Sequence, residues 1–191
     1  MTGSPLFMNT TLHPFLNSGD ISYYGDLFWS CVGPHHDRAS FNLLYLADAY
    51  AANHGTGAPY RASSWFGFRG DDRKMEPKDY ATMPAAKRAA RAWLMKWLSN
   101  AGGSVQWEAT DTGVHFMASA DGLQIGSYYH CPKKKRHWHK GFRAHFGMTF
   151  YREHQVTSPD EAKDVIAETW ADWLRLAKAR FLKVENTEKA D

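Results

Sequence analysis

The sequence predicts an α+β fold in which about three helices pack on a mainly antiparallel sheet. Over 105–129, apolar and polar residues alternate in short runs separated by Asp/Gly turns, which is typical of antiparallel strands. Segments 84–101 and 158–184 instead repeat apolar residues every three or four positions, which is typical of amphipathic helices. Because strands and helices are grouped along the chain, a layered α+β arrangement is expected.

The N-terminal part of the predicted sheet is a β-hairpin. Two mostly apolar runs, 21–24 and 27–32, flank Gly25-Asp26, a turn-forming pair. A further strand is predicted within 61–69, where aromatic residues are dense. The rest of 56–82 is predicted to be loop.

A first helix is predicted after this hairpin. Asp37 is a favourable N-cap residue, and Gly55 is a typical stop. Between them, apolar residues recur at helical intervals at Phe41, Leu44, Tyr45 and Ala51. The pattern therefore predicts a helix from Asp37 to Gly55.

A meander of four strands is predicted in the C-terminal half. Its strands are expected at 105–108, 114–117, 123–129 and 142–151. Turns at 111–113 and at Asp121-Gly122 join the first three strands, and Cys131 to Gly141 connects the last two. With the N-terminal hairpin, this meander makes up the predicted sheet.

Two further helices complete the predicted fold. Pro84 suits the first turn of a helix that ends before Gly102, and Ser158 is placed to cap the last helix. Their apolar faces are expected to share one core on the sheet. The residues expected in this core are Trp93, Trp97, Val165, Ile166 and Trp173.

The length of 191 residues favours a single domain over 1–191, with flexible ends at 1–18 and 185–191. No internal repeat is recognised in the sequence. Because there is no secretion signal or long apolar segment, the protein is expected to be cytoplasmic, or nuclear in a eukaryote, with no membrane partner. Cys31 and Cys131 are expected to be free, mostly buried thiols.

The formal charge of +3 hides a strong separation of charges. None of the 20 acidic residues lies between Asp121 and Glu153, whereas seven of the 23 Lys and Arg residues do. This acid-free segment, 122–152, carries a formal charge of about +7, so the rest of the chain is net negative. Such a concentration of one sign of charge favours a polyanionic partner.

Within this segment, 132–143 alternates basic with aromatic residues and is predicted to be a nucleic-acid-binding hairpin. Lysine and arginine can neutralise phosphates, and aromatic rings can stack on unpaired bases, as in recognition of single strands or loops. The predicted contact residues are Lys133, Lys134, Lys135, Arg136, His137, Trp138, His139, Lys140 and Arg143. The basic outer face of the second helix, with Lys87, Arg88 and Arg91, is a candidate extension of this surface.

Other interpretations of the same segment remain open. It can be a solubilising loop that protects a sheet edge. It can also be the surface of a protein-binding inhibitor or adaptor whose partner is acidic or binds nucleic acid itself. A third alternative is a nuclease, in which histidines act as acid and base or bind a metal.

Two histidine clusters bear on metal binding and catalysis. His35 and His36 precede the expected first helix, which has His54 at its far end. The second cluster consists of His130, Cys131, His137 and His139. Neither cluster has the spacing of a complete zinc site, and no nucleotide-binding or hydrolase signature occurs. We therefore expect a binding protein rather than an enzyme, with no metal, no cofactor and no catalytic residue assigned.

Overall fold

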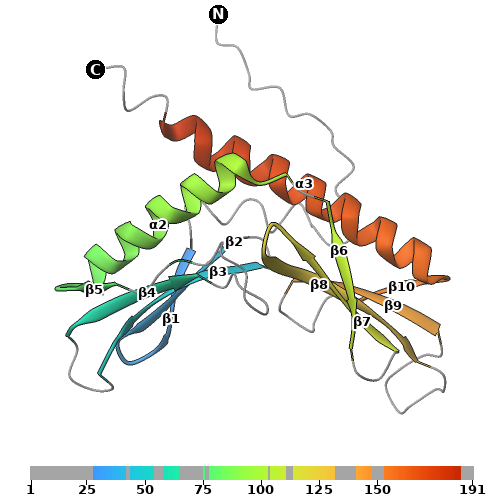
Figure 1. Ribbon diagram of the computed structural model, residues 1–191, viewed down its shortest axis with the longest axis horizontal. Coiled ribbons are helices and arrows are strands. Elements are labelled where there is room, and N and C mark those ends of the chain that lie inside the picture. Colours follow the sequence, from blue (N-terminus) through green and yellow to red (C-terminus); the bar gives the residue numbers. More distant parts are fainter. Residues whose placement is uncertain are drawn as a thin grey trace, which may run out of the picture.

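The structure is a computed structural model. It describes residues 28–41, 44–53, 58–64, 75, 78–102, 104–110, 114–131, 141–147 and 153–185. In this part of the chain there are two five-stranded antiparallel sheets and two helices. Figure 1 shows the sheets side by side, with both helices lying across one side of the molecule.

The first half of the chain forms one sheet and one helix. The strands follow one another in the order β1-β2-β3-β4-β5, and helix α2 packs on β3 and β4. The bounds are β1 Phe28–Gly33, β2 His36–Phe41, β3 Leu44–Ala51, β4 Tyr60–Ser64, β5 Asp79–Tyr80 and α2 Met83–Asn100.

The second half of the chain is built in the same way. Its strands lie in the order β6-β7-β8-β9-β10, and helix α3 packs on β8 and β9. The bounds are β6 Gln106–Ala109, β7 His115–Ala120, β8 Leu123–Cys131, β9 Gly141–Phe146, β10 Glu153–Val156 and α3 Pro159–Glu185.

The strand registers show that the two halves are an internal repeat. His36 lies opposite Tyr50 in the β2–β3 pair, and His115 lies opposite Tyr129 in the β7–β8 pair, each 79 positions later. The same shift relates every residue pair of these two hairpins, including a bulge at the same place in each. The sequence-based expectation that the chain has no internal repeat was therefore wrong.

The outer strands and the helices follow the same plan with small changes in loop length. Thr82 accepts a hydrogen bond from the backbone of Ala85 at the start of α2, and Ser158 accepts one from Glu161 at the start of α3. Identical residues occupy equivalent positions at Trp29 and Trp107, Arg61 and Arg143, Ala62 and Ala144, Ala86 and Ala162, Trp97 and Trp173, and Leu98 and Leu174.

The two halves are joined by a reciprocal pair of tryptophan contacts. Trp97 Nε1 of α2 donates to the carbonyl oxygen of Asp121 in the second half, at 3.0 Å. Trp173 Nε1 of α3 donates to the carbonyl oxygen of Phe41 in the first half, also at 3.0 Å. Because each helix contacts the other half in the same manner, the halves are related by an approximate two-fold axis.

One cluster of buried side chains runs through both halves. Trp97 and Ile166 are buried in it, Trp173 is 1% exposed, and Trp93 and Val165 are partly buried against it. These residues share one core, as predicted, but α2 packs on the first sheet and α3 on the second, so the expectation that both helices lie on one sheet was wrong. The four predicted meander strands correspond to β6, β7, β8 and β9, but β9 ends at Phe146 and a fifth strand, β10, was not predicted. The helix that starts near Pro84 and the Ser158 cap are confirmed.

The predicted helix from Asp37 to Gly55 was wrong, because this segment forms β2 and β3. Phe41, Leu44 and Ala51 are all buried on the helix-covered side of the sheet. Two buried strands that meet at a tight connection can place apolar residues at intervals of three and four positions, which imitates a helix. The described part of the chain therefore has two helices, not the three expected.

The strand predicted over 27–32 is observed as β1, and among the described residues its partner is β2. β1 pairs with β2 through a turn that contains His35, which has a positive φ of 55°. The earlier strand at 21–24, and the turn before β1, lie outside the described residues.

Candidate nucleic-acid interface

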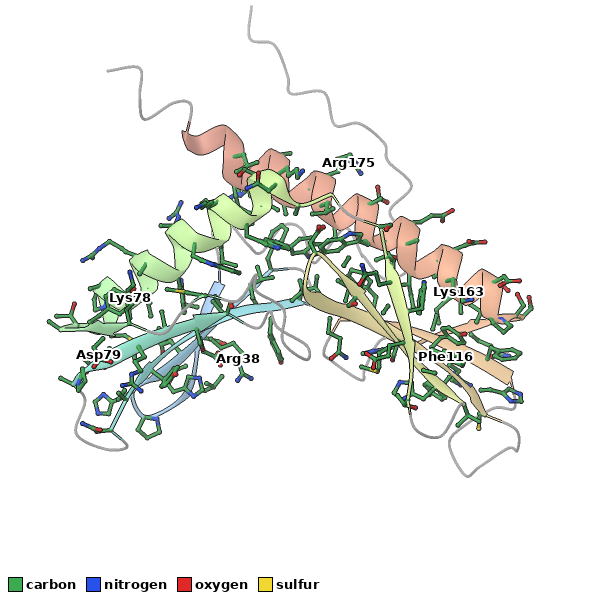
Figure 2. The ribbon with its side chains drawn as sticks, viewed as in Figure 1. Arg38, Lys78, Asp79, Phe116, Lys163 and Arg175 are labelled. Atoms are coloured by element: carbon green, nitrogen blue, oxygen red, sulfur yellow. The ribbon has the colours of Figure 1, made fainter. Side chains whose placement is uncertain are left out.

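Each sheet has one face covered by a helix and one face that the helices leave uncovered. Asp37 forms an ion pair with Lys87 of α2, so it points towards the helix, and the alternation of side chains along a strand turns Arg38 to the other face. Figure 2 shows Arg38 on the side of the first sheet opposite α2. We call the two sides the covered face and the uncovered face.

The same alternation assigns the faces of the second sheet. Tyr128 and Ala144 are buried in the core shared with α3. Their chain neighbours Tyr129 and Arg143 therefore lie on the uncovered face, and they are paired across β8 and β9. Both side chains are partly exposed.

A row of three side chains crosses the uncovered face of the second sheet. His115 lies opposite Tyr129, and Tyr129 lies opposite Arg143. The rings of His115 and Tyr129 meet edge to face with centroids 6.1 Å apart. This row, called here row 2, places an aromatic ring beside a guanidinium group.

The first sheet carries the equivalent row. His36, Tyr50 and Arg61 are paired across β2, β3 and β4, and this set is called row 1. The rings of His36 and Tyr50 also meet edge to face, with centroids 6.0 Å apart. Each half of the protein therefore presents the same three residue types at the same place.

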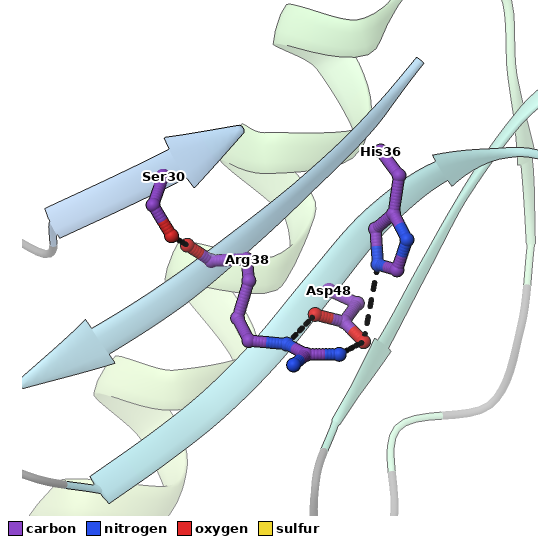
Figure 3. A network of polar contacts seen from close by, with 4 residues as sticks. All are labelled: Ser30, His36, Arg38 and Asp48. Atoms are coloured by element: carbon purple, nitrogen blue, oxygen red, sulfur yellow. Dashed lines mark hydrogen bonds and ion pairs between the residues drawn. The ribbon is translucent and has the colours of Figure 1, made fainter. Parts of the chain in front are cut away.

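Carboxylates neutralise the uncovered face of the first sheet. Arg61 Nε donates to Asp79 Oδ1 at 2.7 Å, and this hydrogen bond and the charge of Asp79 raise the pKa of Arg61. Asp48 accepts from Arg38 at 2.9 and 3.3 Å, and His36 Nε2 lies 3.3 Å from the same carboxylate (Figure 3).

The second sheet lacks these carboxylates at the equivalent positions. Ser127 occupies the position of Asp48, and Met117 that of Arg38. Gln155, the residue opposite Arg143, takes the place of Asp79. The acid-free segment of the sequence contains β8 and β9, and a neutral glutamine lies opposite the arginine of row 2 where an aspartate lies opposite the arginine of row 1.

His115 is held neutral by its surroundings. Burial lowers its pKa from the ordinary value of 6.5, and the charge of His145 lowers it further. Both histidines belong to the uncovered face of the second sheet, where His145 is 8% exposed. The positive charge of row 2 at neutral pH therefore comes from Arg143.

The predicted hairpin segment connects the two strands that carry Tyr129 and Arg143 of row 2. β8 ends at Cys131 and β9 begins at Gly141, and these two residues are paired. Of the predicted contact residues, Arg143 lies in β9, whereas Lys133 to Lys140 lie outside the described residues. Tyr129 and Arg143 are each two residues from the strand ends that this basic segment connects.

The candidate extension on α2 lies in the other half of the molecule. Lys87 contacts Asp37 and lies 5.2 Å from the centroid of the Trp29 ring, on the covered face of the first sheet. Arg88 and Arg91 are exposed on α2. The structure does not place these three residues beside Arg143, and their part in binding stays a prediction.

Several other features bear on function. Within the described residues, no three His, Cys, Asp or Glu side chains are close enough to hold a metal ion.

Neither Cys31 nor Cys131 forms a disulfide, but only Cys131 is buried, so the expectation of buried thiols was half right. A pocket of about 290 Å³ lies at the end of α2 and is lined by Trp93, Lys96, Trp97, Asn100, Ala101 and Asp121. No helix in the described ranges is long and apolar enough to span a membrane.

Sequence reasoning found the basic segment and missed both rows. The signal was present, since His36 and Tyr50 are fourteen positions apart, as are His115 and Tyr129. This spacing alone does not indicate a contact, because only the strand register shows that the two residues of each pair lie opposite each other. No protein-family model, curated protein or solved structure matches this chain.

Proposed function

We propose that this protein binds single-stranded or looped nucleic acid through row 2 and the basic segment 133–140 beside it. One observation carries the proposal. Tyr129 and Arg143 are paired on the uncovered face, at the strand ends that this segment joins. Tyr129, Arg143 and the segment 133–140 all lie within 122–152, which contains no acidic residue.

The chemistry of row 2 suits unpaired nucleotides. An aromatic ring on a sheet face can stack on a base, and stacking contributes roughly 1–3 kcal/mol per base. Arg143 can neutralise a phosphate next to the stacked base, and the lysines of 133–140 can hold the phosphates that follow. None of these contacts reads the edge of a base, so binding is expected to depend weakly on sequence.

The test compares variants of row 2 on a labelled oligothymidylate. Tyr129→Ala is expected to weaken binding by about tenfold, because the ring that stacks on a base is removed. Arg143→Gln is expected to weaken binding and to reduce its salt dependence by about 0.7 log units per log unit of salt.

The control is Arg175→Gln, which removes an exposed arginine of α3 that pairs with Asp172 at 3.1 Å. This variant is expected to bind like the parent. If Tyr129→Ala and Arg143→Gln both bind as well as the parent, row 2 is not the interface. If the parent binds no oligonucleotide at low salt, the nucleic-acid proposal fails, and the acidic protein partner becomes the leading candidate.

A further inference from the structure

The internal repeat gives the protein a second copy of the proposed contact row. Row 1 has the same residue types in the same register as row 2, and the ring geometry of its His–Tyr pair matches within 0.1 Å in centroid separation (6.0 and 6.1 Å). Packing does not require this match, because other uncovered positions differ between the halves. Met117 and Ser127, for example, replace Arg38 and Asp48.

The two rows face the same side of the molecule. Both helices lie across one side, and Figure 1 shows the uncovered faces of both sheets turned to the other side. The reciprocal contacts of Trp97 and Trp173 join the two halves through one core, so the rows are held on a single body. A flexible single strand can therefore follow the uncovered side from one sheet to the other.

We propose that row 1 is a second subsite for the same single strand, used only when the strand is long enough to pass from the second sheet to the first. This inference rests on the proposed function of row 2. It assigns Tyr50 as the stacking residue and Arg61 as the phosphate contact, because these residues are equivalent to Tyr129 and Arg143.

The acids around row 1 set its character. Arg61 is already paired with Asp79, and Asp48 lies between Arg38 and His36. Part of the positive charge is therefore neutralised before a phosphate arrives. Row 1 is expected to bind more weakly than row 2, and to depend more on stacking than on charge.

The experiment uses oligothymidylates of two lengths, about 6 and about 30 nucleotides, which bracket the usual site sizes of single-strand binding surfaces. Binding of the full-length parent, Tyr50→Ala and Tyr129→Ala is measured with each. Tyr129→Ala is expected to weaken both lengths by about tenfold, whereas Tyr50→Ala is expected to weaken the long oligonucleotide by about fivefold and leave the short one unchanged. Circular dichroism and thermal unfolding check that each variant is folded.

Tyr50→Phe and Tyr129→Phe are the matched controls, because each keeps the ring, and both are expected to bind like the parent. If Tyr50→Ala leaves the long oligonucleotide unaffected while Tyr129→Ala weakens it, row 1 is no subsite and the function of row 2 stands. Equal losses at both lengths in Tyr50→Ala would overturn the idea that one strand spans the two rows. If the parent binds neither length, the proposed function itself fails.

Discussion

The two halves of this protein share a fold but differ in charge at two corresponding positions of the uncovered face. In the first half, Asp48 and Asp79 pair with Arg38 and Arg61. In the second half the corresponding positions hold Ser127 and Gln155, which are neutral. The comparison distinguishes the residues that pack each helix on its sheet from the residues that determine the charge of each uncovered face.

The residues that the halves have in common are mostly those that pack. Each helix repeats a tryptophan, a leucine and an alanine, and β2 and β7 repeat an alanine. All of these side chains are buried. These recurring buried residues are Trp97 and Trp173, Leu98 and Leu174, Ala39 and Ala118, and Ala86 and Ala162. Close packing leaves little freedom to change them, whereas the uncovered face tolerates different residue types.

The largest expected effect is the loss of stability when a tryptophan that connects the two halves is removed. Trp173→Ala should reduce the free energy of unfolding by about 3–5 kcal/mol, because it removes a buried ring that packs on Phe41 and leaves the carbonyl of Phe41 without its donor. Trp97→Ala should cost less, since Trp97 is 9% exposed and Trp173 is 1% exposed. Urea unfolding measures both. A larger loss in Trp97→Ala would contradict this ranking.

A smaller effect tests a difference in strand packing. Gly126 is equivalent to Ala47, and a Cβ atom at Gly126 would lie 2.3 Å from the carbonyl oxygen of His145. Gly126→Ala should therefore destabilise the protein by about 1–3 kcal/mol, although Ala is the residue of the other half. The reverse change, Ala47→Gly, should cost only about 1 kcal/mol. Thermal unfolding that shows no loss in Gly126→Ala would contradict the close approach.

Exchanging the acid between the halves should alter binding more than stability. Asp79→Gln gives row 1 the neutral neighbour found in row 2, and Gln155→Asp does the reverse. Because the Arg61–Asp79 pair is exposed, its loss should change stability by less than about 1 kcal/mol. Affinity for a long oligothymidylate should rise in Asp79→Gln and fall in Gln155→Asp. Changes of the opposite sign would show that these acids do not limit phosphate binding.

The smallest expected effect is a pH dependence present in the second half. The folded pKa of His115 lies below 6.5, so the unfolded chain takes up this proton more readily as the pH falls. Stability from this group is therefore complete above about pH 6.5 and is lost as the pH falls towards the lowered pKa. Unfolding measured between about pH 5 and 7 should show a shallower slope in His115→Gln than in the parent.

His145→Ser places the residue of the first half, Ser63, at the equivalent position and should also reduce the slope, because it removes a charge that lowers the pKa of His115. A slope that neither substitution changes would show that other groups control stability in this range.

The sequence predicted the parts of the fold that depend on local pattern. Asp121-Gly122 signals a turn, Pro84 and Ser158 signal helix starts, and the structure confirms all three. The segment from Asp37 to Gly55 failed, because apolar residues on two adjoining strands imitate helical spacing. Only pairing between strands distinguishes the two, and a single segment does not contain that information.

The repeat and the contact rows were hidden for a related reason. Loops of different length change the spacing between equivalent residues, from 79 positions at His36 and His115 to 82 at Arg61 and Arg143. The shared residues are also few and scattered, so the sequence shows no continuous match. The charge separation can be recognised from the sequence alone, because the absence of Asp and Glu from a segment does not depend on how the strands pair.

The most direct test of the proposed function is the salt dependence of binding by the parent and by a variant in which Lys133, Lys134, Lys135 and Arg136 are all replaced by Ser. Fluorescence anisotropy with a labelled oligothymidylate gives the affinity at each salt concentration. The parent should bind with an affinity that falls steeply with salt. The variant should bind far more weakly, with a slope smaller by roughly 0.7 for each phosphate that it no longer neutralises. Equal affinity and equal slope in the two proteins would contradict the proposal.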